Sequence, residues 1–118
     1  MNAKQKGARG ERLWRDELNA NGFTGSMRDG QQGGGVNGSG YHPDTVCPTL
    51  PYLHSEVKFT QNLNVRQALN QAINDCNGNV PIVAWKKNNC PWTVTMLAND
   101  WFNLVNSGSI YLKEKNKL

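Results

Sequence analysis

Two short stretches of the sequence hold residue types that can bind a divalent metal ion beside a phosphate group. Glu56-Val57-Lys58 places an acid and a lysine two positions apart, and Pro43-Asp44 places a second acid upstream. Side chains two positions apart on a β-strand leave the same face, roughly 6–7 Å apart at the backbone. Glu56 and Lys58 can therefore share one phosphate, while Val57 points the other way into a core.

The oxygen ligands of such a site suit Mg²⁺, which takes few ligands from protein and keeps water and phosphate oxygens as the others. Asp44 and Glu56 would supply two ligands and the backbone carbonyl of Val57 a third; Mn²⁺ is a reasonable substitute. The metal would polarise the phosphate and lower the pKa of a bound water. Lys58 would orient that water or stabilise the charge that develops on the phosphate. This chemistry predicts a metal-dependent nuclease.

A further acid, Glu11, is predicted to lie on the inward stripe of a helix over residues 3–21. Asn2 is the expected cap of this helix and Asn21-Gly22 its expected end. Positions at helical spacing that form the stripe are Gly7, Glu11, Trp14 and Leu18. An acid on an apolar stripe is unfavourable unless something pairs with it. We therefore assign Glu11 to the same site.

The elements that must position these residues form an α/β pattern in one domain of 118 residues. Residues 53–60 alternate as a strand, with Leu53, Ser55, Val57 and Phe59 on one face and His54, Glu56, Lys58 and Thr60 on the other. Further strands are predicted over 23–28, 44–47, 80–85 and 92–97, and further helices over 64–76 and 99–105. A mixed central sheet flanked by helices satisfies this order, and the glycine-rich segment 29–41 is predicted to be a flexible loop.

Pro43-Asp44 followed by Glu56-Val57-Lys58 resembles the PD-(D/E)xK nuclease superfamily. Gly7-Ala8-Arg9-Gly10-Glu11-Arg12 is similar to the helix motif of archaeal-type Holliday junction resolvases and small phage nucleases. The resemblance covers about residues 4 to 97 and implies a restriction-endonuclease-like αβββαβ core and a homodimer. It implies that Asp44 and Glu56 bind the metal, that Lys58 is the catalytic lysine, and that Glu11 binds metal directly or through water. Resolvase-like members carry a polar residue on the next helix, for which Gln67 and Gln71 are candidates; the long glycine-rich loop departs from their pattern.

The net charge of +4 and the pI of about 9.1 are compatible with DNA as a partner. Basic residues expected to contact the DNA backbone are Lys4, Lys6, Arg9, Arg12 and Arg28, with a solvated helix face as the alternative. Three cysteines without C-x-x-C spacing argue against a disulfide framework and a zinc site. With no apolar N-terminal run, we expect a cytoplasmic protein, in the host cell if a phage encodes it. His54 is expected at the surface, with a place at the edge of the site, on the face of Glu56, as the alternative.

The leading hypothesis is a Mg²⁺-dependent endodeoxyribonuclease that hydrolyses phosphodiester bonds in recombination, repair or phage DNA processing. A structure-specific, Holliday junction resolvase-like activity is one option for its substrate. The alternative from another class is a catalytically inactive DNA-binding module on the same scaffold. A third hypothesis, a purely structural interaction domain, predicts neither DNA binding nor cleavage.

Overall fold

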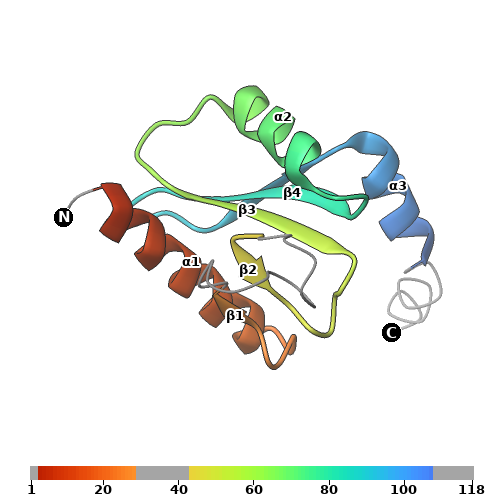
Figure 1. Ribbon diagram of the computed structural model, residues 1–118, viewed down its shortest axis with the longest axis horizontal. Coiled ribbons are helices and arrows are strands. Elements are labelled where there is room, and N and C mark those ends of the chain that lie inside the picture. The colour runs from red at the N-terminus through yellow and green to blue at the C-terminus, as the bar shows by residue number, and fades with distance from the viewer. Residues whose placement is uncertain (1–2, 29–42, 108–118) are drawn as a thin grey trace, which may run out of the picture.

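The computed structural model describes residues 3–28 and 43–107 (Figure 1). The elements in chain order are α1 (Ala3–Ala20), β1 (Met27–Arg28), β2 (Thr45–Val46), β3 (Leu53–Phe59), α2 (Val65–Asp75), β4 (Val80–Lys86), β5 (Thr93–Met96) and α3 (Ala98–Ser107). The expected cap Asn2 and the glycine-rich segment 29–41 lie outside the described residues.

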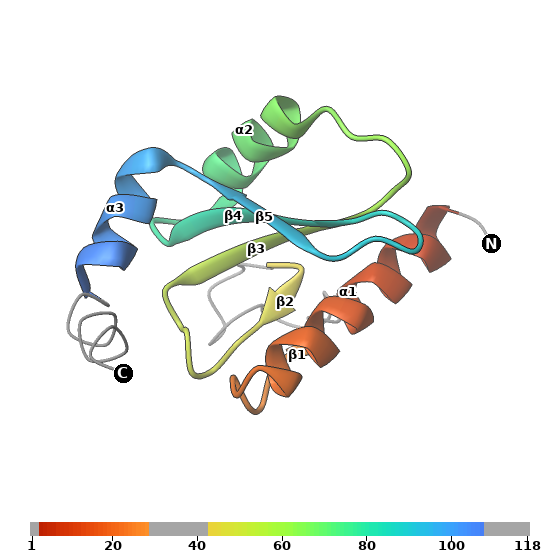
Figure 2. The ribbon, with the colours of Figure 1, turned by 180° about the vertical axis from the view of Figure 1, so that it is seen from behind.

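Five strands form one mixed sheet in the order β1-β2-β3-β4-β5. β3 and β4 run parallel, and the other neighbours are antiparallel. The helices α1 and α2 cover opposite faces, as Figures 1 and 2 show from two sides. The predicted α/β class with a mixed sheet flanked by helices is confirmed, and the elements from α1 to β4 follow the order αβββαβ.

The helix α1 is fixed to the central strand β3 by one polar and one steric contact. Trp14 is buried, and its Nε1 donates a hydrogen bond to Ser55 Oγ at 3.1 Å. A Cβ atom on Gly10 would lie 2.7 Å from Phe59 Cβ, so the helix approaches β3 more closely than a larger residue would allow. These contacts set the position of Glu11, one residue after Gly10.

The predicted alternation of β3 is confirmed by the two cores of the domain. Val57 packs with Trp14 in the core beneath α1. Glu56 is in register with Val83 of β4, and Val83 packs with Ala72 in the core beneath α2. The odd-numbered side chains of β3 therefore face α1, and the even-numbered ones face the α2 layer.

Local sequence signals explain both ends of α2. Asn64 Oδ1 accepts a hydrogen bond from the backbone N–H of Gln67 at 3.0 Å, as an N-cap residue does. Beyond the helix, Asn77 and Gly78 have φ angles of 52° and 80°, the left-handed conformation that ends many helices.

The elements at the two edges of the sheet differ from the prediction. The strand expected over 23–28 is reduced to Met27–Arg28, because Ser26 Oγ bonds back to the carbonyl of Phe23 and Gly25 has a φ of 81°. The strand expected over 44–47 is reduced to Thr45–Val46. At the other edge α3 begins at Ala98, one residue before the expected cap, and buries none of its side chains. Among the described helices, none combines the length and apolar character that crossing a bilayer requires.

Candidate active site

The candidate site begins where β2 begins. β2 is paired with β3 at Thr45 opposite Ser55, and the next residue toward the N-terminus, Asp44, is outside the strand. Its Oδ2 atom accepts a hydrogen bond from the backbone N–H of Val57 at 2.8 Å. A carboxylate therefore occupies the position on the β3 edge that a strand backbone would take if β2 were longer. It lies against the peptide group that joins Glu56 to Val57.

Glu56 lies on the α2-facing side of β3, between a histidine and a lysine. Its Oε1 atom is 3.6 Å from Lys58 Nζ, and its Oε2 atom is 3.6 Å from His54 Nε2. The Glu56 side chain is 10% exposed and that of Lys58 is 28% exposed. Lys58 can therefore reach both the buried carboxylate and the solvent side of the site.

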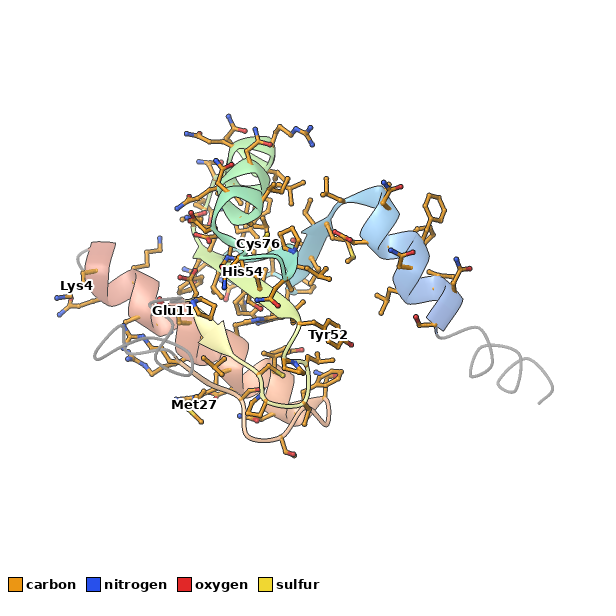
Figure 3. The ribbon with its side chains drawn as sticks, turned by 45° about the vertical axis from the view of Figure 1, so that its right-hand side comes forward. Lys4, Glu11, Met27, Tyr52, His54 and Cys76 are labelled. Carbon is orange, nitrogen blue, oxygen red and sulfur yellow. The ribbon has the colours of Figure 1, made fainter. Side chains whose placement is uncertain are left out.

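His54 is buried, so the expectation of a surface histidine was wrong. The physical reason is its place on the middle strand of five, on the face that α2 covers (Figure 3). The alternation of residues 53–60 indicated the face of this side chain. It did not indicate that a helix 11 residues long would close over that face.

The pKa of Asp44 reflects the charges that surround it in the site. Its pKa is raised to about 7, chiefly because burial disfavours the charged carboxylate and next because Glu56 is negative. Glu11 raises the pKa further, whereas the Val57 N–H and the Lys58 ammonium oppose the rise. The fold thus brings Glu11, Glu56 and Lys58 within electrostatic range of Asp44, and Asp44 is close to half protonated at neutral pH.

Glu11 reaches the site from α1 and is held by an ion pair. Its Oε2 atom accepts a hydrogen bond from Arg28 Nε at 2.8 Å, and its side chain is 14% exposed. Figure 3 shows Glu11 on α1 beside β2. Arg28 was predicted to contact DNA, and its pairing with Glu11 was not foreseen. Nothing in the sequence pattern connects two residues 17 positions apart on different elements.

The donor set fits a hard divalent cation at Asp44 and Glu56. The buried Glu56 and the partly buried Asp44 repel each other, and a bound cation would relieve this repulsion in place of the proton on Asp44. In residues 3–28 and 43–107 there is no group of three or more acid, histidine or cysteine side chains already arranged around one point. The proposed ligand set does not require one, because the Val57 carbonyl, water and phosphate would complete the shell.

The remaining predicted residues lie mostly on exposed helix surfaces. Gln67 and Gln71 are exposed on α2, and Lys4 and Arg12 are exposed on α1. Arg9 is also exposed, Lys6 is partly exposed, and the cations of both lie near the Phe59 ring. The auxiliary and DNA-binding roles of these residues stay predictions.

Comparisons of the chain with protein-family models, with curated proteins and with solved structures found no match. The resemblance to PD-(D/E)xK nucleases therefore stays a prediction. It depends on the motif residues and on their arrangement around Asp44.

Proposed function

We propose that this protein is a Mg²⁺-dependent endodeoxyribonuclease of the PD-(D/E)xK type. The observation that carries the proposal is the position of Asp44. Its carboxylate is hydrogen-bonded to the β3 backbone and electrostatically coupled to two further acids and a lysine from two other elements. Burial of a carboxylate beside other carboxylates is unfavourable, and acids whose pKa is strongly raised in this way are frequent at functional sites.

In this proposal each residue of the site has a separate task. Asp44 and Glu56 hold the cation, and Glu11 contributes a third carboxylate directly or through water. A bound divalent cation supplies polarisation of the phosphate and a more acidic water. Lys58, partly exposed and 3.6 Å from Glu56, neutralises charge on the phosphate or orients the attacking water. Arg28 holds Glu11 in place through their ion pair.

The test is a cleavage panel of four-way junction, flap, linear duplex and single-stranded DNA with Mg²⁺ or Mn²⁺. Wild-type protein should cut at least one substrate and be inhibited by a chelator. Glu56→Gln and Lys58→Ala should lose cleavage and retain DNA binding. Glu17→Gln, which changes an exposed acid on α1, is the matched control and should cut normally. Undiminished cleavage by both site variants contradicts the proposal.

The second candidate function is a catalytically inactive DNA-binding module on the same scaffold. One observation favours it: the ion pair with Arg28 already neutralises Glu11. This candidate predicts that the wild-type protein retains all the DNA substrates of the panel and cuts none of them in Mg²⁺ or Mn²⁺.

The partners that we propose are DNA and a second copy of the chain, in a cytoplasm where DNA is accessible. Support for self-association comes from α3, where Trp101, Phe102 and Leu104 are about half exposed, at 49%, 55% and 58%. Adjacent exposed apolar side chains are more typical of contact surfaces than of free ones. Light scattering after size-exclusion chromatography should give twice the monomer mass of 13.1 kDa, and Trp101→Ser with Leu104→Ser should give the monomer.

A further inference from the structure

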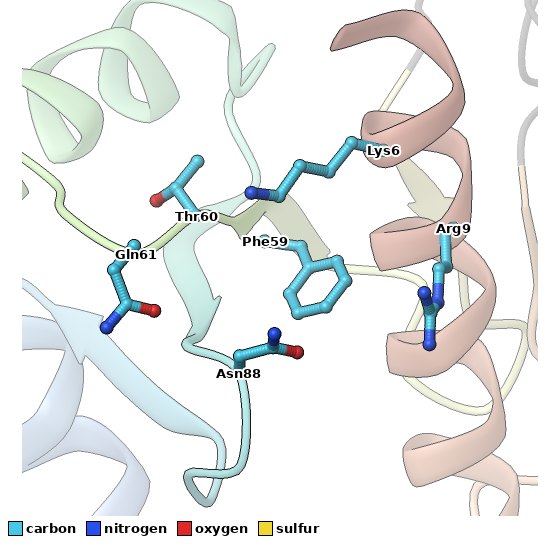
Figure 4. A pocket seen from close by; sticks show the side chains of 6 residues that line it. All are labelled: Lys6, Arg9, Phe59, Thr60, Gln61 and Asn88. Atoms are coloured by element: carbon cyan, nitrogen blue, oxygen red, sulfur yellow. The ribbon is translucent and has the colours of Figure 1, made fainter. Parts of the chain in front are cut away.

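A pocket of about 250 Å³ lies between α1 and the ends of β3 and β4 (Figure 4). The residues that line it are Lys6, Arg9, Phe59, Thr60, Gln61 and Asn88. At about 100° per residue, Arg9 is about 200° and Lys6 about 140° around α1 from Glu11. The pocket is therefore on the other flank of the helix from the carboxylates and is not part of the acidic site.

Two cations of the pocket are held by an aromatic ring. Lys6 Nζ is 5.7 Å and Arg9 Cζ is 5.6 Å from the centre of the Phe59 ring. Both distances lie within the range of cation–π attraction. The ring has no net charge, so this attraction positions the two cations without neutralising them.

The charges of Lys6 and Arg9 differ in this respect from those of other basic residues near the site. Arg28 is paired with Glu11 and Arg15 with Asp16, at 2.8 and 2.9 Å. No carboxylate among the described residues forms such a pair with Lys6 or Arg9. Two positive charges at one concave surface favour an anion with several oxygens.

Neutral hydrogen-bonding groups complete the lining. Gln61 and Asn88 present exposed side-chain amides at the pocket. Phe59 is only 9% exposed, so a nucleobase has little ring surface on which to stack. The lining therefore suits a phosphate group better than a base.

We propose that this pocket binds a backbone phosphate of DNA that lies outside the scissile phosphodiester group. The identity of the ligand as DNA depends on the proposed function. Phe59 directly follows Lys58 on β3, and the two side chains leave opposite faces of the strand near its end. A DNA backbone that passes around this end of β3 can reach Lys58 with one phosphate and the pocket with another.

The test measures DNA affinity against salt concentration by fluorescence anisotropy in EDTA, which prevents cleavage. Each phosphate contact contributes about −0.9 to the slope of log K against log salt concentration for duplex DNA. The double variant Lys6→Gln/Arg9→Gln should lose about one unit of slope and bind about tenfold or more weakly at about 0.1 M salt. The double variant Arg15→Gln/Arg66→Gln removes the same charge elsewhere on α1 and α2 and should change the slope much less. Equal changes in both variants would overturn the proposal.

A second pair of variants keeps the cations and places a negative charge instead. Asn88→Asp puts a carboxylate into the pocket, whereas Asn89→Asp puts it one residue away on the same turn, outside the lining. Both side chains are exposed, so both variants should fold, which circular dichroism checks. Asn88→Asp should weaken DNA binding about tenfold more than Asn89→Asp does, and equal binding would refute the assignment.

Two further arms separate this inference from the proposed function. An oligonucleotide with a terminal 5′-phosphate and one without it should show the same loss in the double variant, because the proposed ligand is an internal phosphate. A loss confined to the phosphorylated end would overturn that assignment. If the pocket variants weaken DNA binding but the wild-type protein never cuts DNA, the nuclease proposal is refuted and the pocket assignment is supported. If the protein cuts DNA but Lys6→Gln/Arg9→Gln leaves the salt dependence of DNA binding unchanged, the pocket assignment is refuted and the nuclease proposal is supported.

Discussion

The two faces of β3 differ sharply in what they carry. On the face toward α1, Val57 and Ser55 are buried against Trp14, through apolar packing and one hydrogen bond. On the face toward α2, Glu56 lies between His54 and Lys58, with ionisable groups 3.6 Å apart. Within β3, the residues proposed for chemistry therefore lie on the face toward α2, whereas the face toward α1 carries only packing contacts and one hydrogen bond. Substitutions on the α2 face should therefore mainly reduce cleavage, whereas substitutions on the α1 face should mainly reduce stability.

The largest effect is expected on the α2 face. Glu56→Gln removes a proposed metal ligand and should lower single-turnover cleavage about 10³-fold or more, because the electrostatic stabilisation of the reacting phosphate is lost. The glutamine has the same shape and relieves a buried charge, so the free energy of unfolding in urea should change little or rise. Cleavage within about tenfold of the wild type, or a large loss of stability, would contradict the separation of the two faces.

The pH dependence of cleavage should follow Asp44. With Mg²⁺ below saturation, the rate should rise about tenfold per pH unit and level off above about pH 7, because only the deprotonated carboxylate can bind the metal. More Mg²⁺ should move the rise to lower pH, since the metal and the proton compete for the same group. A pH profile of the cleavage rate that does not shift with the Mg²⁺ concentration would show that Asp44 does not bind the metal.

The same carboxyl group should make the fold less stable as the pH rises. Its pKa is about 7 in the folded protein against 3.8 for a free aspartate side chain, so folding takes up a proton between these limits. Stability from this group is therefore highest below about pH 4 and falls as the pH increases to about 7. Asp44→Asn should be more stable than the wild type at about pH 8, by on the order of 1 kcal/mol or more.

Urea unfolding at about pH 5 and about pH 8 checks this prediction. The stabilisation by Asp44→Asn should be clearly larger at the higher pH, whereas the exposed control Asp75→Asn should show no such difference. An equal effect at both pH values would mean that the burial of Asp44 does not disfavour its charge.

On the α1 side of β3, the stability of the fold should depend on the volume of the side chains between the helix and the strand. Gly10→Ala places a Cβ atom 2.7 Å from Phe59 Cβ, so the helix or the strand must move, and we expect a loss of about 1–3 kcal/mol. Gly7→Ala on the same helix has no atom within 4 Å and should instead stabilise by about 0.5–1 kcal/mol. Thermal unfolding of the two variants gives the comparison, and a shift in the same direction for both would contradict the close contact.

An effect smaller than that of Gly10→Ala is expected from the hydrogen bond on this face. Ser55→Ala leaves the buried Trp14 Nε1 without its partner and should cost about 1–2 kcal/mol. Cleavage measured well below the melting temperature should stay near that of the wild type. Ser107→Ala, at an exposed position on α3, should leave the stability within about 0.5 kcal/mol.

The elements that could be predicted are those whose residue types follow a periodic pattern along the sequence. The 3.6-residue period of α2, its Asn64 cap and the two-residue alternation of β3 indicated the elements and the face of each side chain. The missed features are contacts between distant elements, such as the Glu11–Arg28 pair and the cover of α2 over His54. The shortness of β1 and β2 was missed for the same reason, because the bonds of Ser26 and Asp44 that limit them leave no periodic signal.

The replacement of a strand residue by the side chain of Asp44 makes the connection between β2 and β3 sensitive to insertions and deletions. Residues 47–52 fix which position of β3 stands opposite Thr45, and a slip of one residue would exchange the two faces of the strand. A mutation that lengthens or shortens this connection should therefore be tolerated far less than one in the turn between β4 and β5. Natural variants of this chain should accordingly keep its length constant while its residue types drift.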